Sequence, residues 1–204
     1  MASSKTNRGL IGWGVLALVV VVVGIAFAGT YNRLVSLDQA VQSQWAQVES
    51  VYQRRADLIP NLVATVKGAA EFEKSSYIAV AQARAKVGQL NLGGGVPNDP
   101  AAFAKFSAAQ DALSSALSHL LVVVERYPDL KATQNFADLQ AQLEGTENRI
   151  SVERMRFNKT AQAYNTARNS FPTVLLAGMF GPRFAQKAYF ASAPGSATAP
   201  QVKF

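Results

Sequence analysis

The sequence predicts an all-α protein: an N-terminal transmembrane helix followed by a long antiparallel, up-and-down four-helix bundle. Three observations support this fold class. An uncharged apolar run spans Leu10 to Ala28, apolar residues beyond it recur every three or four positions, and the final stretch keeps a seven-residue repeat. Hydrophobic residues make up 49% of the chain and charged residues 16%, which excludes a disordered protein.

These patterns divide the chain into five segments. We expect a short N-terminal flank at 1–9, a transmembrane helix at 10–29 and the helical bundle at 30–171. An apolar and basic membrane-proximal segment follows at 172–190, and a disordered tail rich in Pro, Gly, Ser and Ala occupies 191–204.

The apolar run has the length of a membrane span. Its 19 residues rise about 28 Å as a helix, which is close to the thickness of the hydrocarbon layer. Trp13 lies near one end and Tyr31 just beyond the other, where amphipathic rings favour the lipid–water interface. Both are therefore predicted membrane-interface residues.

Basic residues near the run bear on processing and orientation. Lys5 and Arg8 precede it and Ala26–Ala28 resembles a cleavage site, so a cleaved signal peptide is the alternative to an anchor. The run is longer than the usual signal-peptide core, which favours the anchor. Arg33 is the basic residue closest to its other end, so the positive-inside rule favours a cytoplasmic N-terminus with the bundle outside.

The first two bundle helices are predicted on either side of the segment Arg54–Asn61. Proline costs about 3 kcal/mol inside a helix but little near a helix start. We therefore place a sharp turn near Asp57, with Pro60 in the first turn of the second helix. A kinked but continuous helix is the alternative. The predicted core positions of the two helices are Leu34, Leu37, Val41, Trp45, Val48, Tyr52, Ile59, Leu62, Val66, Ala69, Tyr77, Val80, Ala83 and Val87.

A glycine-rich loop at 88–99 leads to the third helix. Asn98 or Asp99 can cap this helix, with Pro100 at its first position, and Pro128 ends it. Its predicted core positions follow a strict three-four repeat: Phe103, Phe106, Gln110, Leu113, Leu117, Leu120, Val124 and Tyr127.

The fourth helix has the most regular pattern, and Pro172 closes it. Sustained 3.5-residue periodicity indicates coiled-coil-like packing at shallow crossing angles. A second position of each seven-residue repeat, between the successive apolar members, also faces the neighbouring helices and is often small or polar. Such residues fit best where several helices meet, or where another protomer completes the packing. The seven-residue repeat consists of Phe136, Leu143, Ile150, Phe157, Tyr164 and Phe171.

Four antiparallel helices place alternate connections at opposite ends of the bundle. The Arg54–Asn61 and Arg126–Lys131 turns then share the tip furthest from the membrane. There we predict a patch that either pairs the two hairpins or docks a partner. Its residues are Arg54, Arg55, Asp57, Glu125, Arg126 and Asp129.

The same arrangement brings the end of the fourth helix close to the bilayer. The tail Val174–Phe180, followed by Arg183 and Lys187, is then predicted to rest on the interface with its charges toward the headgroups. Packing of this stretch on the bundle is the alternative. Phe180, Arg183 and Lys187 accordingly join the predicted membrane-interface residues.

Several motifs closely resemble the LemA family. They are Tyr31–Val35, Arg54–Val63, Leu121–Lys131, Leu143–Ile150, Tyr164-Asn165 and Ser170-Phe171-Pro172. The resemblance covers roughly residues 25–190 in order, and the glycine-rich connection at 93–95 is its one evident departure. It implies a bacterial cell (inner) membrane protein with a four-helix bundle. Members resemble membrane-associated scaffold proteins, and a relative takes part in building magnetosome membranes. No catalytic residues come with the resemblance.

The residue types needed for catalysis or metal binding are scarce. The chain has no cysteine and a single histidine, His119, which excludes the usual zinc sets, and Glu144 and Glu147 lack the histidine partners of a di-iron bundle. We expect no enzyme activity and no cofactor. The net charge of +7 suits an anionic lipid surface, whereas the aromatic-interleaved basic clusters of a nucleic-acid platform are missing.

Two functions fit these observations. The first is a self-associating protein that organises the membrane or membrane-bound partners, with the lipid bilayer and a homo-oligomer as its partners. The second is a membrane-tethered adaptor or signalling module that presents the distal tip to an unidentified partner protein.

Overall fold

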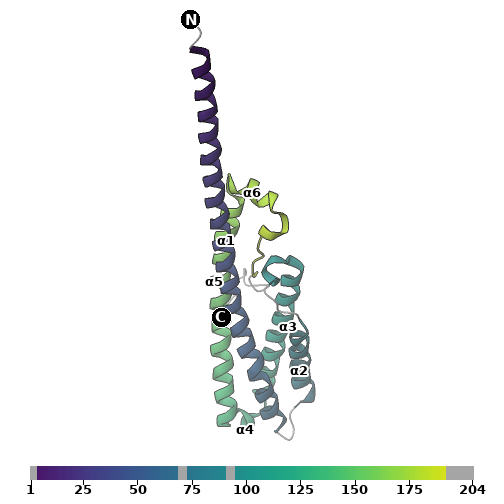
Figure 1. Ribbon diagram of the computed structural model, residues 1–204. Coiled ribbons are helices and arrows are strands. Elements are labelled where there is room, and N and C mark those ends of the chain that lie inside the picture. The colour runs from purple at the N-terminus through teal and green to yellow at the C-terminus, as the bar shows by residue number, and fades with distance from the viewer. Residues whose placement is uncertain (1–3, 69–72, 91–94, 192–204) are drawn as a thin grey trace, which may run out of the picture.

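The computed structural model describes residues 4–68, 73–90 and 95–191, with side chains from Gly12 onward (Figure 1). All regular structure in these ranges is helical, which confirms the predicted fold class. Most of the predicted tail at 191–204 and of the glycine run at 93–95 lies outside the described residues. The elements are α1 (Ser4–Lys67), α2 (Lys74–Gly88), η1 (Val96–Asn98), α3 (Pro100–Val124), α4 (Pro128–Lys131), α5 (Gln134–Asn169), α6 (Thr173–Met179) and η2 (Gly181–Phe184).

Helix α1 is both the anchor and the first helix of the bundle. Its 64 residues extend about 96 Å, and its N-terminal part projects beyond the bundle as a stalk (Figure 1). Every side chain from Gly12 to Gly29 is exposed. Helix α3 is also long and apolar enough to cross a membrane, but its apolar face is buried in the bundle core. The stalk of α1, in contrast, leaves its apolar side chains exposed, as a membrane-associated helix does.

The predicted turn near Asp57 is wrong, because α1 continues through Pro60 to Lys67. Pro60 has no N–H, so the backbone carbonyl of Ala56 loses its partner four residues later. Arg84 of α2 replaces that partner: its Nε donates a 3.0 Å hydrogen bond to the Ala56 oxygen. The alternative of a continuous helix is correct, and the chain reverses between the end of α1 and the start of α2 instead.

Four helices, α1, α2, α3 and α5, run up and down in the bundle (Figure 1). α1 packs along α5 and against α2, and α2 packs against α3. The backbones of α3 and α5 approach each other less closely, and side chains such as Arg154 and Asp111 connect the two helices. Asp99 caps α3 by accepting hydrogen bonds from the backbone N–H groups of Ala101 and Ala102, at 2.8 and 3.1 Å.

The core consists of two clusters stacked along the bundle axis. The membrane-proximal cluster is aromatic: the ring of Trp45 lies 5.0–5.8 Å from the rings of Phe103, Phe106 and Phe157. The distal cluster is mainly aliphatic and includes Ile59, Leu62, Val66, Leu113 and Leu120. Burial of each such side chain contributes about 1.5–3 kcal/mol, so the three-four repeats account for the packing.

The seven-residue repeat of α5 is buried over its first five members, Phe136 to Tyr164. Phe171, the sixth, is 82% exposed. The physical reason is that α5 ends at Asn169, so Phe171 no longer follows the helical phase that directs the earlier members inward.

Beyond α6 the chain turns back along the bundle. Gly181, the first residue of η2, has φ of +55°, a left-handed conformation that favours glycine. Residues 185–191, which we call the strap, then run beside α5 and insert the ring of Phe190 among Trp45, Phe103 and Phe157. Phe190 is only 6% exposed.

Candidate functional site

Exposed apolar side chains gather where the bundle meets the stalk. The most exposed of them are Phe171, Leu175 and Met179, which are 82%, 62% and 75% exposed. Helix α6 also contacts the stalk, because the ring of Phe180 lies 6.2 Å from that of Phe27. We call this surface the apolar collar, and define it as Phe171, Val174, Leu175, Met179 and Phe180.

The inner face of α6 and η2 packs on the bundle. Ala177 and Phe184 are each 1% exposed, and Tyr31 of α1 packs against the rings of Phe180 and Phe184 at 5.3 and 5.7 Å. The segment therefore has one face on the protein and an opposite apolar face left open. The two sequence interpretations, packing on the bundle and an apolar face toward lipid, are compatible.

Four of the five predicted interface residues lie near the stalk, and the fifth, Lys187, is buried in the bundle. Trp13 is 73% exposed on the stalk, and Phe180 is 37% exposed. Tyr31 lies beneath the guanidinium of Arg183, which is 5.4 Å from the ring centroid. These four lie along the stalk and the collar.

Lys187 was predicted to face the lipid headgroups, and this prediction is wrong, because the residue is only 2% exposed. Its ammonium forms an ion pair with Asp38 of α1 and donates to Asn98 of η1. It also lies 4.6 Å from the ring centroid of Tyr164. The strap carries Lys187 back into the bundle, where a charge is stable only because these groups replace water.

Two asparagines of α5 hold the backbone of the strap. Asn165 accepts from the N–H of Lys187 at 2.9 Å and donates to its carbonyl at 2.9 Å. Asn158 makes the same pair of bonds with Phe190, at 2.9 and 2.8 Å. The two asparagines are seven residues apart and so share one helix face, which is the sequence signal that could have revealed the strap.

Arg55 is not at the distal tip but in the bundle interior, 1% exposed. Its guanidinium donates to Ser114 Oγ at 2.6 Å, to Glu147 Oε2 at 2.9 Å and to Gln110 Oε1 at 2.5 Å. It also lies 5.1 Å from the Tyr52 ring centroid. These contacts join α1, α3 and α5, so Arg55 links three helices across the core.

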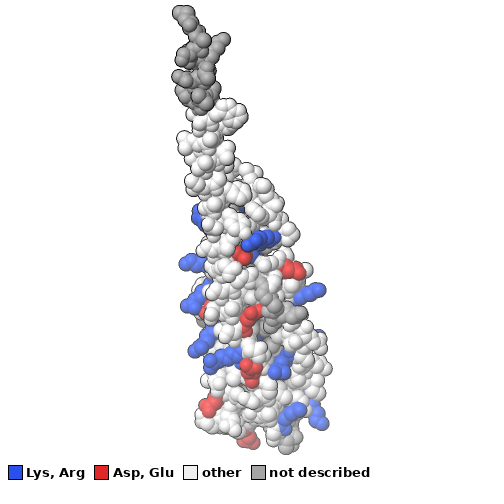
Figure 2. Space-filling view, in the orientation of Figure 1, with Lys and Arg blue, Asp and Glu red and all other residues white. Residues whose placement is uncertain are grey.

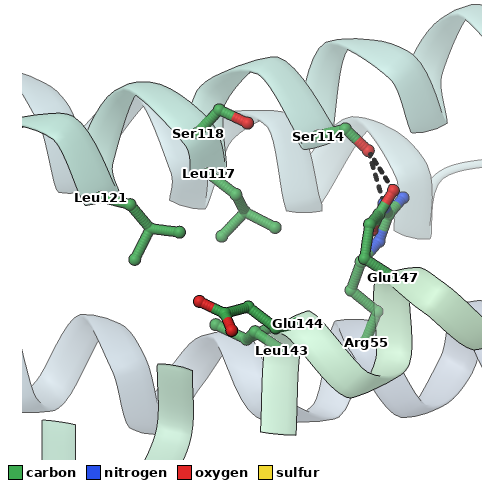
Figure 3. Close-up of a pocket in the computed structure, with 8 residues that line it drawn as sticks. All are labelled: Arg55, Ser114, Leu117, Ser118, Leu121, Leu143, Glu144 and Glu147. Carbon is green, nitrogen blue, oxygen red and sulfur yellow. Dashed lines mark hydrogen bonds and ion pairs between the residues drawn. The ribbon is translucent and has the colours of Figure 1, made fainter. Parts of the chain in front are cut away.

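A small pocket of about 240 Å³ opens beside this network, in the seam between α3 and α5. Figure 3 shows Leu117 and Leu121 on one wall and Leu143 and Glu144 on the other, with Arg55 bonded to its partners at one end. The pocket is mainly apolar and smaller than usual small-molecule sites. Within the described chain, no group of three His, Asp or Glu side chains is arranged to hold a metal ion.

A second network lies one to two turns nearer the membrane. Arg154 of α5 donates to the Tyr52 hydroxyl at 2.5 Å and forms an ion pair with Asp111 of α3 at 2.8 Å. Burial raises the pKa of the Tyr52 phenol, while the charges of Arg154 and Arg55 act in the opposite direction. These polar groups also serve to bind helices to one another.

The predicted tip patch is divided by the continuation of α1. Glu125, Arg126 and Asp129 do lie at the distal end, where Arg126 pairs with Glu73 at 3.1 Å and Lys131 pairs with Glu125 at 2.5 Å. A hydrogen bond from Ser75, assisted by Arg126, lowers the pKa of the exposed Glu73 carboxyl.

The α1 members of that patch lie further up the bundle. Arg54 is exposed on α1, and Asp57 accepts a 2.7 Å hydrogen bond from Gln53 within the same helix. The patch is not formed as predicted, because its α1 residues precede the end of that helix at Lys67 by three to four turns.

Charge is distributed unevenly along the molecule. Figure 2 shows Lys, Arg, Asp and Glu side chains of both signs over the bundle, and none on the described stalk above the collar. An uncharged stalk, an apolar collar and a charged bundle follow one another along one axis. This sequence of surfaces matches hydrocarbon, interface and water.

Comparison with known proteins identifies relatives of this chain. The LemA family model matches residues 44–204. Magnetosome protein MamQ of Magnetospirillum gryphiswaldense is 27% identical over 184 residues, which span 82% of this chain and 67% of that protein. Magnetosome protein MamQ 2 of Paramagnetospirillum magneticum is 25% identical over 194 residues, 85% of this chain and 71% of that protein.

A further relative carries the family name itself. Protein LemA of Metamycoplasma hominis is 20% identical over 147 residues, which cover 72% of this chain and 63% of that protein. The family match includes the distal part of α1, all other described helices and the strap. With its apolar N-terminal stalk and all-helical bundle, this chain belongs to the LemA family.

Proposed function

We propose that this protein is a non-enzymatic scaffold that self-associates in the bacterial inner membrane and organises the membrane or membrane-bound partners. The continuity of α1 carries the proposal. Because one helix forms both the span and the bundle core, the bundle cannot rotate on a flexible linker, and its surfaces keep a constant orientation to the bilayer.

Two further observations support a structural role. The buried charges Arg55 and Lys187 are neutralised by Glu147 and Asp38 and bonded to side chains on other elements, as expected of groups that hold helices together. The relatives named magnetosome proteins also point toward work at a membrane.

The stalk is the most direct candidate for self-association. Gly24 and Ala28 are four residues apart on one face, a spacing that lets transmembrane helices approach closely, and open space surrounds Gly24. Mass photometry of the full chain in native-lipid particles is expected to show oligomers. Gly24→Leu should shift the distribution toward monomer, while Val22→Leu on the opposite face should leave it unchanged. Monomers alone in the wild type would exclude the scaffold.

The orientation proposed for this scaffold is a cytoplasmic N-terminus with the bundle outside. Protease added to intact spheroplasts is then expected to digest the bundle, starting at its exposed loops. Complete protection of the bundle, with digestion only after lysis, would reverse the orientation.

An adaptor that presents the distal tip is the second candidate. It is favoured by the exposure of the tip charges: the side chains of Arg126 and Glu73 are 66% and 45% exposed although they pair. Crosslinking in native membranes with mass spectrometry distinguishes the two functions. Arg126→Glu should abolish capture of a partner in the adaptor and leave crosslinks between copies intact in the scaffold. Arg54→Glu serves as the control, since Arg54 lies off the tip.

A further inference from the structure

A hollow of about 440 Å³ lies between α1 and α5 at the membrane-proximal end of the bundle. Thr30 and Arg33 of α1 and Gln162 and Thr166 of α5 form its walls, and the turn at 170–173 closes one side. None of these residues belongs to the Arg55 or Lys187 networks.

The stalk determines the depth of this hollow in a membrane. Thr30 and Arg33 follow Ala28, where the apolar run ends, by two and five residues, or about 3 and 8 Å along the helix. The headgroup layer is about 5–8 Å thick on each side of the hydrocarbon. The contact between Phe180 and Phe27 places α6 level with the final turn of the run. The hollow therefore coincides with the headgroup layer.

The chemistry of the walls suits a phosphate group. Arg33 is exposed, and among the side chains that the structure describes it forms no ion pair or hydrogen bond. No carboxylate lines the hollow, while Gln162, Thr166 and Thr173 contribute an amide and two hydroxyl groups. A guanidinium with neutral donors around it is the usual protein partner of a phosphate, because its planar fork donates two parallel hydrogen bonds.

The hollow also borders an apolar surface. Phe171 and Pro172 line it, and Phe171 continues into the collar with Leu175 and Met179. A phosphate in water needs no such neighbours. A phospholipid does, because its acyl chains descend beside the site that holds its headgroup.

We propose that Arg33 and this hollow bind the headgroup of an anionic phospholipid from the leaflet on the bundle side. The proposal deepens the membrane scaffold proposed above and rests on it for the depth of the hollow. A bound lipid neutralises Arg33, the first basic residue after the apolar run in the sequence, and seals the groove between α1 and α5. The scaffold would thereby favour membrane regions rich in anionic lipid.

Native mass spectrometry of the full chain tests this site. The protein is reconstituted in nanodiscs holding equal amounts of phosphatidylglycerol and phosphatidylcholine, and the lipids retained on release are counted. Wild type is expected to retain phosphatidylglycerol over phosphatidylcholine by about tenfold, the effect of one strong charge-assisted contact. Arg33→Gln should remove this preference, and Arg33→Lys should restore part of it.

Arg149→Gln is the matched control, since Arg149 is also exposed but lies on α5 about 25 Å further from the membrane end. Equal retention of the two lipids by wild type, or equal losses in Arg33→Gln and Arg149→Gln, would overturn the site. An Arg33-dependent adduct of inorganic phosphate in nanodiscs of phosphatidylcholine alone would overturn the lipid assignment. The same spectra report subunit number, so a failure of self-association is read separately from a failure of lipid binding.

Discussion

The guanidinium Nε of Arg84 on α2 donates a 3.0 Å hydrogen bond to the backbone carbonyl of Ala56 on α1, a residue 28 positions earlier in the chain. That carbonyl is the one that Pro60 leaves without an intrahelical donor. Arg84 on α2 thereby supplies the hydrogen-bond donor that Pro60 lacks, and α1 continues beyond the proline. Ile59, Leu62 and Val66 then continue the buried face of α1.

This relationship predicts that Arg84 and Pro60 are energetically coupled. Arg84→Ala is expected to lower the free energy of unfolding by about 1 kcal/mol, the net worth of one hydrogen bond. In a Pro60→Ala background the same change should cost almost nothing, because the substituted residue then donates its own backbone N–H to the Ala56 carbonyl. Urea unfolding of the full chain in micelles, followed by circular dichroism, measures both. Equal losses in the two backgrounds would contradict the coupling.

The burial of Arg55 predicts a large difference between two adjacent arginines. Arg55→Ala is expected to destabilise the bundle by about 3 kcal/mol, because it removes contacts to three helices and leaves Gln110 and Ser114 without their donor. Arg54→Ala, an exposed change on the same helix, should stay within about 0.5 kcal/mol. Thermal unfolding of the two variants gives the comparison, and similar values for both would show that Arg55 does not link the helices.

The strap should be an integral part of the aromatic core. Phe190→Ala is expected to cost about 3 kcal/mol, since it removes a ring packed on Trp45, Phe103 and Phe157. Gln186→Ala, at an exposed strap position, should be neutral. Limited proteolysis followed by mass spectrometry reports whether the strap is released. Resistance of residues 185–191 in Phe190→Ala would indicate that the asparagine contacts alone retain it.

The raised pKa of Tyr164 predicts that the folded protein loses stability at alkaline pH. Burial raises its pKa to about 12, with Asp38 acting in the same direction and Arg168 opposing it. The folded pKa exceeds the value of about 10 for an unfolded tyrosine, so the neutral phenol contributes its stability fully below pH 10. That contribution is lost as the pH rises from about 10 through 12, with a slope of up to about 1.4 kcal/mol per pH unit.

Tyr164→Phe removes the phenol alone and keeps the Lys187 ammonium that faces the same ring. The Tyr164 hydroxyl has no hydrogen-bond partner among the described residues, so the variant should fold normally at neutral pH. Urea unfolding at several alkaline pH values should show a shallower loss in the variant than in the wild type. Parallel curves would assign the alkaline loss to other groups.

Local pattern was sufficient to predict most of the helical scaffold. The buried positions of α1, α3 and α5 follow spacings of three, four and seven residues, because a helix shows one face to its neighbours wherever it packs. The stalk was equally predictable, since nineteen uncharged residues satisfy the length that a bilayer demands. The cap at Asp99 and the end of α3 before Pro128 also depend on nearby residues alone.

The site residues were harder to place because their partners are distant in the chain. The positions of Arg54, Arg55 and Asp57 depend on where α1 ends. Pro60 alone predicts an end near Asp57, whereas the contact from Arg84 to Ala56 lets the helix continue. Lys187 resembled a headgroup contact because its basic charge follows an apolar stretch. Its true partner, Asp38, is 149 residues away.

The sequence by itself therefore determined most of the residues that face inward, which stretch is apolar enough to enter a membrane and how many helices form the bundle, because periodicity and hydropathy act over a few turns. Only the tertiary structure decided that α1 passes through Pro60, that Arg55 and Lys187 are interior charges, and that the chain returns as a strap. Each of these depends on a hydrogen bond or ion pair between separate helices, and such a contact exists only once the helices have packed.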